Sequence, residues 1–148
     1  MATRSATVQW TGGLQDGSGQ VSLDSSHVGT FDVSFPRRIA DEAGGVTSPE
    51  ELIAAAHASC FAMALSGGIE KAGGTPGATS ITADVTVGPD EEQGGLKISR
   101  IALDVTVSAE GISADDFDRV AEETKTGCPV SKALAAVPEV VLSARLSD

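Results

Sequence analysis

The chain has 148 residues, which is enough for one domain with a substantial core. Its formal net charge of −11 at pH 7 argues against nucleic acids and anionic membrane surfaces as partners, because both attract basic patches. No segment is expected to reach the length of a membrane span, and the first residues lack the apolar stretch of a signal peptide. We therefore expect a cytoplasmic protein, in which two reduced cysteines indicate redox chemistry rather than a structural disulfide.

Three short strands are predicted at the start of the chain. Their apolar alternation is centred on Ala6–Trp10, then on Val21 and Leu23, then on Phe31–Phe35, and the first strand should have one buried face. Turn-length gaps between them favour an antiparallel meander. Pro36 ends the third strand, and Arg37 and Arg38 follow it directly.

The stretch 48–65 predicts a central helix. Ser48 is a good N-cap, Pro49 suits the first helical position, and Glu51 completes a capping box. The rest is apolar on almost every side, so we expect the helix to be buried all round. Cys60 lies in its middle, and Gly73-Gly74 ends any continuation.

The second half of the chain predicts two further helices among three strands. We expect strands at 81–87, 96–107 and 139–146, an amphipathic helix capped by Ser113, and a short helix opened by Gly127-Cys128-Pro129. The apolar alternation slips near Ser99-Arg100, which indicates a β-bulge. The order of elements predicts an α+β fold with mainly antiparallel sheets.

Cys60 needs help to act as a nucleophile. In mid-helix the dipole cannot lower its pKa directly, and burial raises the pKa of a thiol. A nearby cation is required, and Arg37 and Arg38 are the candidates. Otherwise Cys60 is a small apolar core residue and the arginines are a solvated pair.

Cys128 has a different setting, because it precedes Pro129 at the start of a helix. This N-cap position stabilises a thiolate, so local electrostatics predict Cys128 to be the more acidic thiol. The two cysteines suggest a thiol–disulfide pair. A permanent bridge would stabilise the fold by about 4 kcal/mol, but a cytoplasmic setting disfavours it.

His57 lies three residues before Cys60, so the two share a helix face. A Cys60/His57 dyad for acyl transfer is one interpretation, and a histidine satisfied in the core is the more typical one. The two cysteines and two histidines show no recognisable metal-site spacing.

Residues 48–65, together with Gly-Cys-Pro-Val-Ser-Lys-Ala-Leu at 127–134, closely resemble the OsmC/Ohr family of thiol-dependent hydroperoxide reductases. His-Ala-Ser-Cys and Phe-Pro-Arg-Arg are more similar to the OsmC branch. The resemblance covers nearly the whole chain and implies a single OsmC-like domain over residues 1–148. It also implies antiparallel sheets around a buried central helix, in an intertwined homodimer without a cofactor.

The resemblance implies a mechanism as well. Cys60 would attack an organic hydroperoxide, or less efficiently hydrogen peroxide, and release an alcohol. Cys128 would resolve the sulfenic acid as a disulfide, and an external dithiol, a lipoyl group in the best-understood members, would reduce it. The family's arginine corresponds to Arg38, with Arg37 left open, and its glutamate to Glu50, which orients the arginine. The activity would serve defence against oxidative or osmotic stress.

The spacing gives an independent reason to expect a dimer. Glu50 and Cys60 are ten residues apart, about 15 Å along a helix axis, so they cannot meet within one straight helix. An antiparallel pair of helices with a two-fold axis near Ala55 would bring Glu50 of one chain level with Cys60 of the other. We therefore expect each active site to draw residues from both chains.

Two other functions remain open from the sequence. One is an acyl hydrolase built on Cys60 and His57, which would act on thioesters. The other is a non-enzymatic binding or structural domain whose cysteines are inert.

Overall fold

The computed structural model describes residues 1–147, and its internal contacts divide the chain into two compact units, Met1–Leu52 and Ile53–Asp148. The expectation of a single domain over residues 1–148 stays a prediction.

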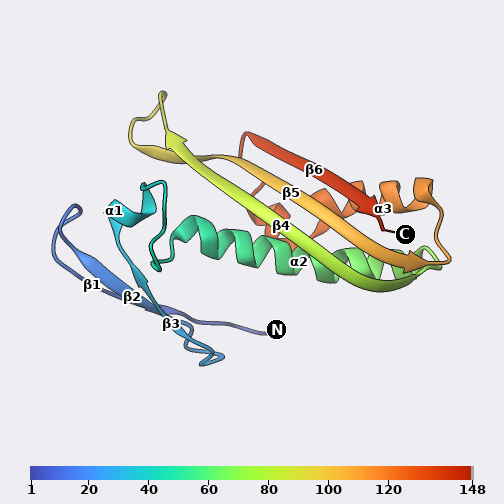
Figure 1. Cartoon of the computed structure of the whole chain (residues 1–148), viewed down its shortest axis with the longest axis horizontal. Helices are drawn as coiled ribbons and strands as arrows, with labels where there is room; N and C mark the ends of the chain where they lie inside the picture. Colours follow the sequence, from blue (N-terminus) through green and yellow to red (C-terminus); the bar gives the residue numbers. More distant parts are fainter. Residues whose placement is uncertain (148) are drawn as a thin grey trace. The chain divides into compact units, whose positions relative to one another are not determined.

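The first unit contains the predicted meander. Strands β1 (Thr7–Thr11), β2 (Ser18–Ser22) and β3 (Thr30–Val33) pair antiparallel in the order β1-β2-β3 (Figure 1). The expected buried face of the first strand is wrong, because every residue of β1 is exposed. Only Val21 of β2 is buried among the residues of these three strands.

The third strand is shorter than expected because a helix replaces its end. Helix α1 (Phe35–Arg38) starts directly after Ser34, and Pro36 in its first turn has the fixed φ that suits a helix start. Phe35 therefore belongs to α1 rather than to β3. Both arginines lie in the last turn of α1.

Helix α2 (Pro49–Lys71) starts where the sequence predicts. The Ser48 hydroxyl accepts a hydrogen bond of 3.1 Å from the Glu51 backbone N–H, which satisfies one of the free amides of the first turn. The helix ends just before Gly73, whose φ of +90° is costly for any residue with a Cβ.

The prediction that α2 is buried on all sides is wrong for the single chain. A buried stripe at helical spacing faces the core: His57, Phe61, Leu65 and Ile69. The opposite side is exposed at Ala55, Ala56, Ser59 and Met63, and Met63 is 75% exposed. By length and composition α2 could also cross a membrane, so the expectation that no segment reaches that length is wrong. Core helices of soluble proteins pass the same test.

The second unit is built on a three-stranded sheet. Strands β4 (Thr75–Pro89), β5 (Leu96–Glu110) and β6 (Glu139–Leu146) lie in the order β4-β5-β6, and β4 pairs antiparallel with β5. Thr86 is opposite Arg100 and Val87 is opposite Ile98, so Ser99 is the extra residue of the predicted bulge. Strand β6 runs parallel to β5, which differs from a purely antiparallel sheet.

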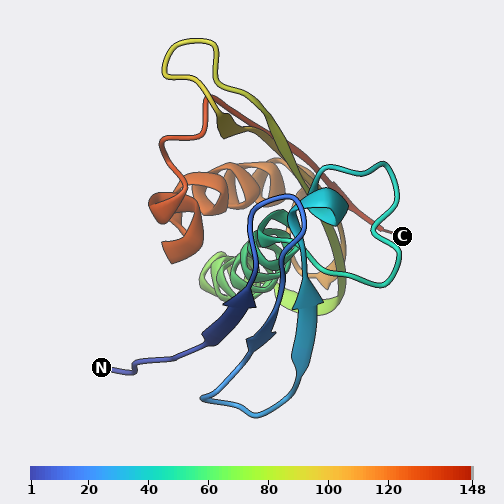
Figure 2. The same ribbon diagram turned by 90° about the vertical axis from the view of Figure 1, so that its left-hand side faces the viewer.

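Helices α3 (Ala114–Gly127) and α4 (Pro129–Ala133) connect β5 to β6. This connection is long enough to carry the chain back to the end of the sheet where β5 begins, as a parallel pair requires. The second-unit part of α2 and helix α3 cover one face of the sheet (Figures 1 and 2). The core between them is almost entirely apolar: Phe61, Leu65, Ile69, Ile101, Leu103, Val105, Val107, Phe117, Val120 and Ala121. The α+β class is confirmed.

Candidate functional site

The first unit holds a guanidinium–carboxylate pair. Arg38 comes from the end of α1 and Glu50 from the first turn of α2. Arg38 donates from Nε to both Glu50 carboxylate oxygens at 3.1 Å and from a terminal nitrogen to Oε1 at 2.6 Å. The Glu50 side chain is 8% exposed and that of Arg38 is 30% exposed. The cation is therefore fixed by a nearly buried acid and keeps access to solvent.

This pair stays charged at neutral pH. Burial alone would raise the pKa of Glu50, but hydrogen bonds from Arg38, from the backbone and from Ser48 hold that pKa below its usual value. The hydrogen bond to Glu50 in turn raises the pKa of Arg38. Arg37 is exposed and forms no ion pair within residues 1–147. Of the two arginines, Arg38 is therefore the one that pairs with an acid.

An apolar cavity of about 490 Å³ lies beside Arg38 in the same unit. Its walls include side chains that the meander leaves exposed, among them Val8, Trp10 and Leu14, and Phe35 of α1. The guanidinium therefore borders a space suited to an apolar group.

The second unit brings the two cysteines together. Cys60 lies within α2, and Cys128 is at once the C-cap of α3 and the N-cap of α4. Both are free thiols, and they are close enough for each to shift the pKa of the other. Cys128 is only 1% exposed, whereas Cys60 is half-buried.

The two thiols differ in acidity. Burial raises the pKa of Cys60, and its interaction with Cys128 raises it further, against the lowering effect of the Val130 backbone N–H. Burial opposes ionisation of Cys128 too, but hydrogen bonds from Ser131, Cys60 and Val130 outweigh it and lower the pKa of Cys128. The directions of the two pKa shifts agree with the prediction that Cys128 is the more acidic thiol.

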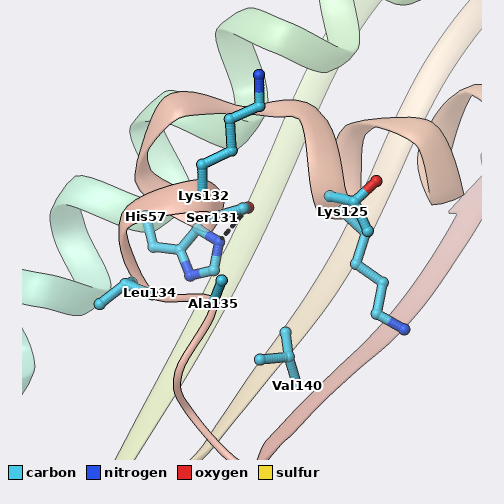
Figure 3. Close-up of a pocket in the computed structure, with 8 residues that line it drawn as sticks. His57, Lys125, Ser131, Lys132, Leu134, Ala135 and Val140 are labelled. Carbon is cyan, nitrogen blue, oxygen red and sulfur yellow. Dashed lines mark hydrogen bonds between the residues drawn. The ribbon is translucent and has the colours of Figure 1, made fainter.

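Ser131 is a functional candidate that the sequence reasoning missed. Its backbone N–H donates to Cys128 Sγ at 3.3 Å, and its hydroxyl lies 3.0 Å from the same sulfur. The hydroxyl also lies 2.8 Å from Nε2 of His57, which is fully buried (Figure 3). The third residue after an N-cap is where a capping partner stands, so the Cys-Pro-Val-Ser spacing contained a signal.

His57 makes its contact with Ser131 rather than with Cys60. Its Nε2 is used in the hydrogen bond to Ser131, and burial lowers the pKa of His57. A cavity of about 340 Å³ borders the ring and is lined also by Leu134, Ala135 and Val140 (Figure 3). The geometry is that of a neutral core histidine bound to Ser131.

The predicted site residues therefore form two groups, one in each compact unit: Arg38 with Glu50, and Cys60 with Cys128. Across residues 1–147, no set of three or more His, Cys, Asp or Glu side chains is arranged to hold a metal ion.

Comparison with known proteins adds a family context. The family described as OsmC-like protein matches residues 42–143. The chain is 42% identical to the peroxiredoxin OsmC of Escherichia coli over 94% of this chain and 93% of that protein. It is 32% identical to the organic hydroperoxide resistance protein OhrA of Bacillus subtilis over 93% of this chain and 92% of that one.

A solved structure is similar over the full length. It is an organic hydroperoxide resistance protein from Elizabethkingia anophelis, with a TM-score of 0.73 and 28% identity over 98% of both chains.

Proposed function

Because the chain belongs to the OsmC-like protein family, we propose that it is a thiol-dependent peroxidase that reduces organic hydroperoxides to alcohols. Hydrogen peroxide is a poorer substrate in this proposal. The observation that carries it is the contact between a half-buried thiol, Cys60, and a second, more acidic thiol, Cys128. The names of the two similar proteins, a peroxiredoxin and an organic hydroperoxide resistance protein, agree with this chemistry.

The reaction has two steps on sulfur. The Cys60 thiolate attacks the terminal peroxide oxygen, the O–O bond breaks, and the alkoxide takes a proton and leaves as the alcohol. Cys128 then attacks the Cys60 sulfenic acid, water leaves, and a Cys60–Cys128 disulfide forms. The contact between the thiols supports this assignment, because the second step needs them within bonding reach.

Cys60 still needs a cation to ionise. Among residues 1–147, Cys128 is the only side chain that shifts the pKa of Cys60; it is not cationic, and the net shift is upward. Arg38, held by Glu50, is the cation we assign to this role, with Arg37 as the alternative. The arginine would stabilise the thiolate and polarise the peroxide.

We assign that arginine to the partner chain of a homodimer. Glu50 and Cys60 are ten positions apart in α2, about 15 Å along the axis, so a two-fold axis near Ala55 would align the acid of one chain with the thiol of the other. The exposed, mainly apolar side of α2, with Ala55, Ala56 and Met63, supports this arrangement because it leaves apolar area for a partner helix.

The apolar cavity beside Arg38 supports an organic rather than an inorganic peroxide. Its walls suit the carbon chain of a hydroperoxide, while the guanidinium addresses the polar end. A dithiol, such as a lipoyl group, would reduce the disulfide and complete the cycle in the cytoplasm.

The first experiment uses the two cysteine variants. Cys60→Ser should abolish turnover of cumene hydroperoxide with a dithiol, and Cys128→Ser should leave a sulfenic acid that dimedone traps on Cys60. Ser80→Ala, an exposed change on strand β4, serves as the control. Full turnover by Cys60→Ser would sink the proposal, and thioester hydrolysis surviving in Cys128→Ser would favour the acyl hydrolase.

The second experiment tests whether sites are shared between chains. Arg38→Ala and Cys60→Ser should each be inactive alone, but exchange of subunits should recover roughly a quarter of wild-type activity, because mixed dimers then hold one intact site. An own-chain site predicts no recovery on mixing. That outcome would overturn the shared-site arrangement and leave the peroxidase chemistry standing.

A further inference from the structure

The hydrogen bonds from His57 through Ser131 to Cys128 form a series of donors that reaches into the core, called here the donor chain. Nε2 of His57 lies 2.8 Å from the Ser131 hydroxyl, which lies 3.0 Å from Cys128 Sγ. The Ser131 backbone N–H adds a second contact to the sulfur at 3.3 Å. His57, Ser131 and Cys128 are all buried, so these bonds are shielded from bulk solvent.

The tautomer of His57 sets the direction of this chain. A neutral imidazole has one N–H and one lone pair, and burial keeps His57 neutral by lowering its pKa. Nδ1 is buried and has no hydrogen-bond partner within residues 1–147. An orphaned buried N–H is the rarer and more costly case, so the proton belongs on Nε2, which donates to Ser131 Oγ.

The Ser131 hydroxyl is then left with its hydrogen directed to the sulfur. Cys128 Sγ receives two donors from Ser131, the hydroxyl and the backbone N–H, and two donors stabilise a thiolate over a thiol. Within the part of the chain that the structure describes, the titratable group that influences Cys128 is Cys60 on α2. Lys125 and Lys132 line the cavity beside His57, with their ammonium groups pointing away from the ring (Figure 3).

We propose that His57 and Ser131 are positioning residues that make Cys128 the leaving sulfur when the Cys60–Cys128 disulfide is reduced, so that the incoming reductant bonds to Cys60. This inference rests on the proposed function for the existence of the disulfide. In thiol–disulfide exchange the sulfur that is better stabilised as a thiolate leaves faster. Cys60 is also the accessible sulfur, since Cys128 is only 1% exposed.

The exchange balances with a dithiol as the reductant. One dithiol sulfur, as a thiolate, attacks Cys60 Sγ, the Cys60–Cys128 bond breaks, and its electron pair goes to Cys128, where Ser131 stabilises the thiolate. The second dithiol sulfur, after losing its proton, attacks the first and forms the oxidised reductant. Cys60 then leaves and takes up that proton, so two electrons have passed from the dithiol to the protein.

The first test locates the mixed disulfide. The protein is oxidised with diamide, which needs no peroxidase activity, then exposed briefly to glutathione, quenched in acid and mapped by peptide mass spectrometry. Completing the exchange needs a second glutathione molecule, so the adduct trapped after a brief exposure marks the attacked sulfur. We expect glutathione on Cys60, and an adduct found chiefly on Cys128 would overturn the proposal.

The second test measures the donor chain alone in Cys60→Ser protein, where Cys128 is the one remaining thiol. Adding Ser131→Ala should lower the Cys128 thiolate fraction at neutral pH about tenfold, read from the absorbance titration of the thiolate. Ser131→Thr should restore it, and Ser80→Ala, an exposed change on β4, should not change it. His57→Leu should act like Ser131→Ala, whereas His57→Gln, which keeps an N–H donor, should retain most of the thiolate.

These outcomes separate the two proposals. An unchanged titration in Ser131→Ala would refute the donor chain whether or not the protein turns over peroxide. Absence of peroxidase activity in wild-type protein that still shows the titration effect and the Cys60 adduct would refute the proposed function and leave the donor chain intact.

Discussion

Arg38→Met tests how strongly the ion pair of the first unit holds its acid in place. The change removes three hydrogen bonds from Glu50, whose side chain is 8% exposed, and keeps most of the aliphatic volume. Hydrogen bonds to charged groups contribute about 1.5–3 kcal/mol, and breaking a fully buried pair costs about 3–5 kcal/mol. Because the Arg38 side chain is 30% exposed, water can reach part of the vacated space, so we expect a loss of about 2 kcal/mol.

The pH dependence of this loss has a definite sign. In the wild type the pKa of Glu50 lies below its usual value, so the pair's contribution is present above the unfolded pKa and disappears as pH falls through the folded pKa. Without Arg38, burial should raise the pKa of Glu50. In acid Glu50 is then protonated, and the variant no longer holds an unpaired buried charge. The difference between wild type and variant should therefore narrow as pH falls from neutral to about 4.

The assay is urea unfolding of reduced protein at both pH values, with Arg37→Met as the matched control. Arg37 lies on the same helix and is exposed, so its loss should change the free energy of unfolding by less than about 0.5 kcal/mol. Equal losses for the two arginines, or a loss at Arg38 that does not shrink in acid, would refute the reasoning.

Four further substitutions test the packing of the second unit, each by urea unfolding. Gly67→Ala should stabilise by about 0.5–1 kcal/mol, because its Cβ meets nothing within 4 Å, whereas Gly68→Ala should destabilise by about 1–3 kcal/mol, because its Cβ would lie 2.6 Å from Val120 Cγ1. Phe61→Ala should cost about 3–5 kcal/mol, since Phe61 is fully buried, and a smaller loss would contradict the packing described. Because burial lowers the pKa of His57, wild-type stability should fall as pH drops below about 6.5, and His57→Gln should show a shallower fall.

Local signals in the sequence were sufficient for the starts of α2, α3 and α4 and for the irregular strand, whereas the start of α1 was missed. Ser48, Ser113 and Cys128 each accept a hydrogen bond from the backbone N–H three residues on, which depends only on residue type and spacing. The slipped alternation at Ser99 likewise marked the bulge, because one extra residue reverses the faces of a strand.

Features that depend on distant parts of the chain could not be read in the same way. Whether β6 runs parallel or antiparallel to β5 depends on where α3 and α4 deliver the chain. The exposed side of α2 carries alanines and a methionine, so composition did not distinguish it from the buried side.

The candidate site was predictable in part. The family resemblance and the spacing suggested Arg38 with Glu50 and Cys60 with Cys128, and both pairs are in contact. The catalytic roles of these four residues stay predictions. The contact between His57 and Ser131 joins residues 74 positions apart, and no local pattern links them. The spacing in the sequence instead suggested Cys60, three residues further along the same helix, as the partner of His57.

Cys128 belongs to two helices at once, because its backbone N–H bonds to Thr124 at the end of α3 and its sulfur accepts the Ser131 N–H at the start of α4. Drawing that sulfur into a covalent bond weakens it as an acceptor, so the short helix α4 loses part of the support for its first turn. If the proposed disulfide forms, local order at the junction depends on the oxidation state of the protein. Deuterium uptake at the Ser131 amide should rise when the disulfide forms and return when it is reduced.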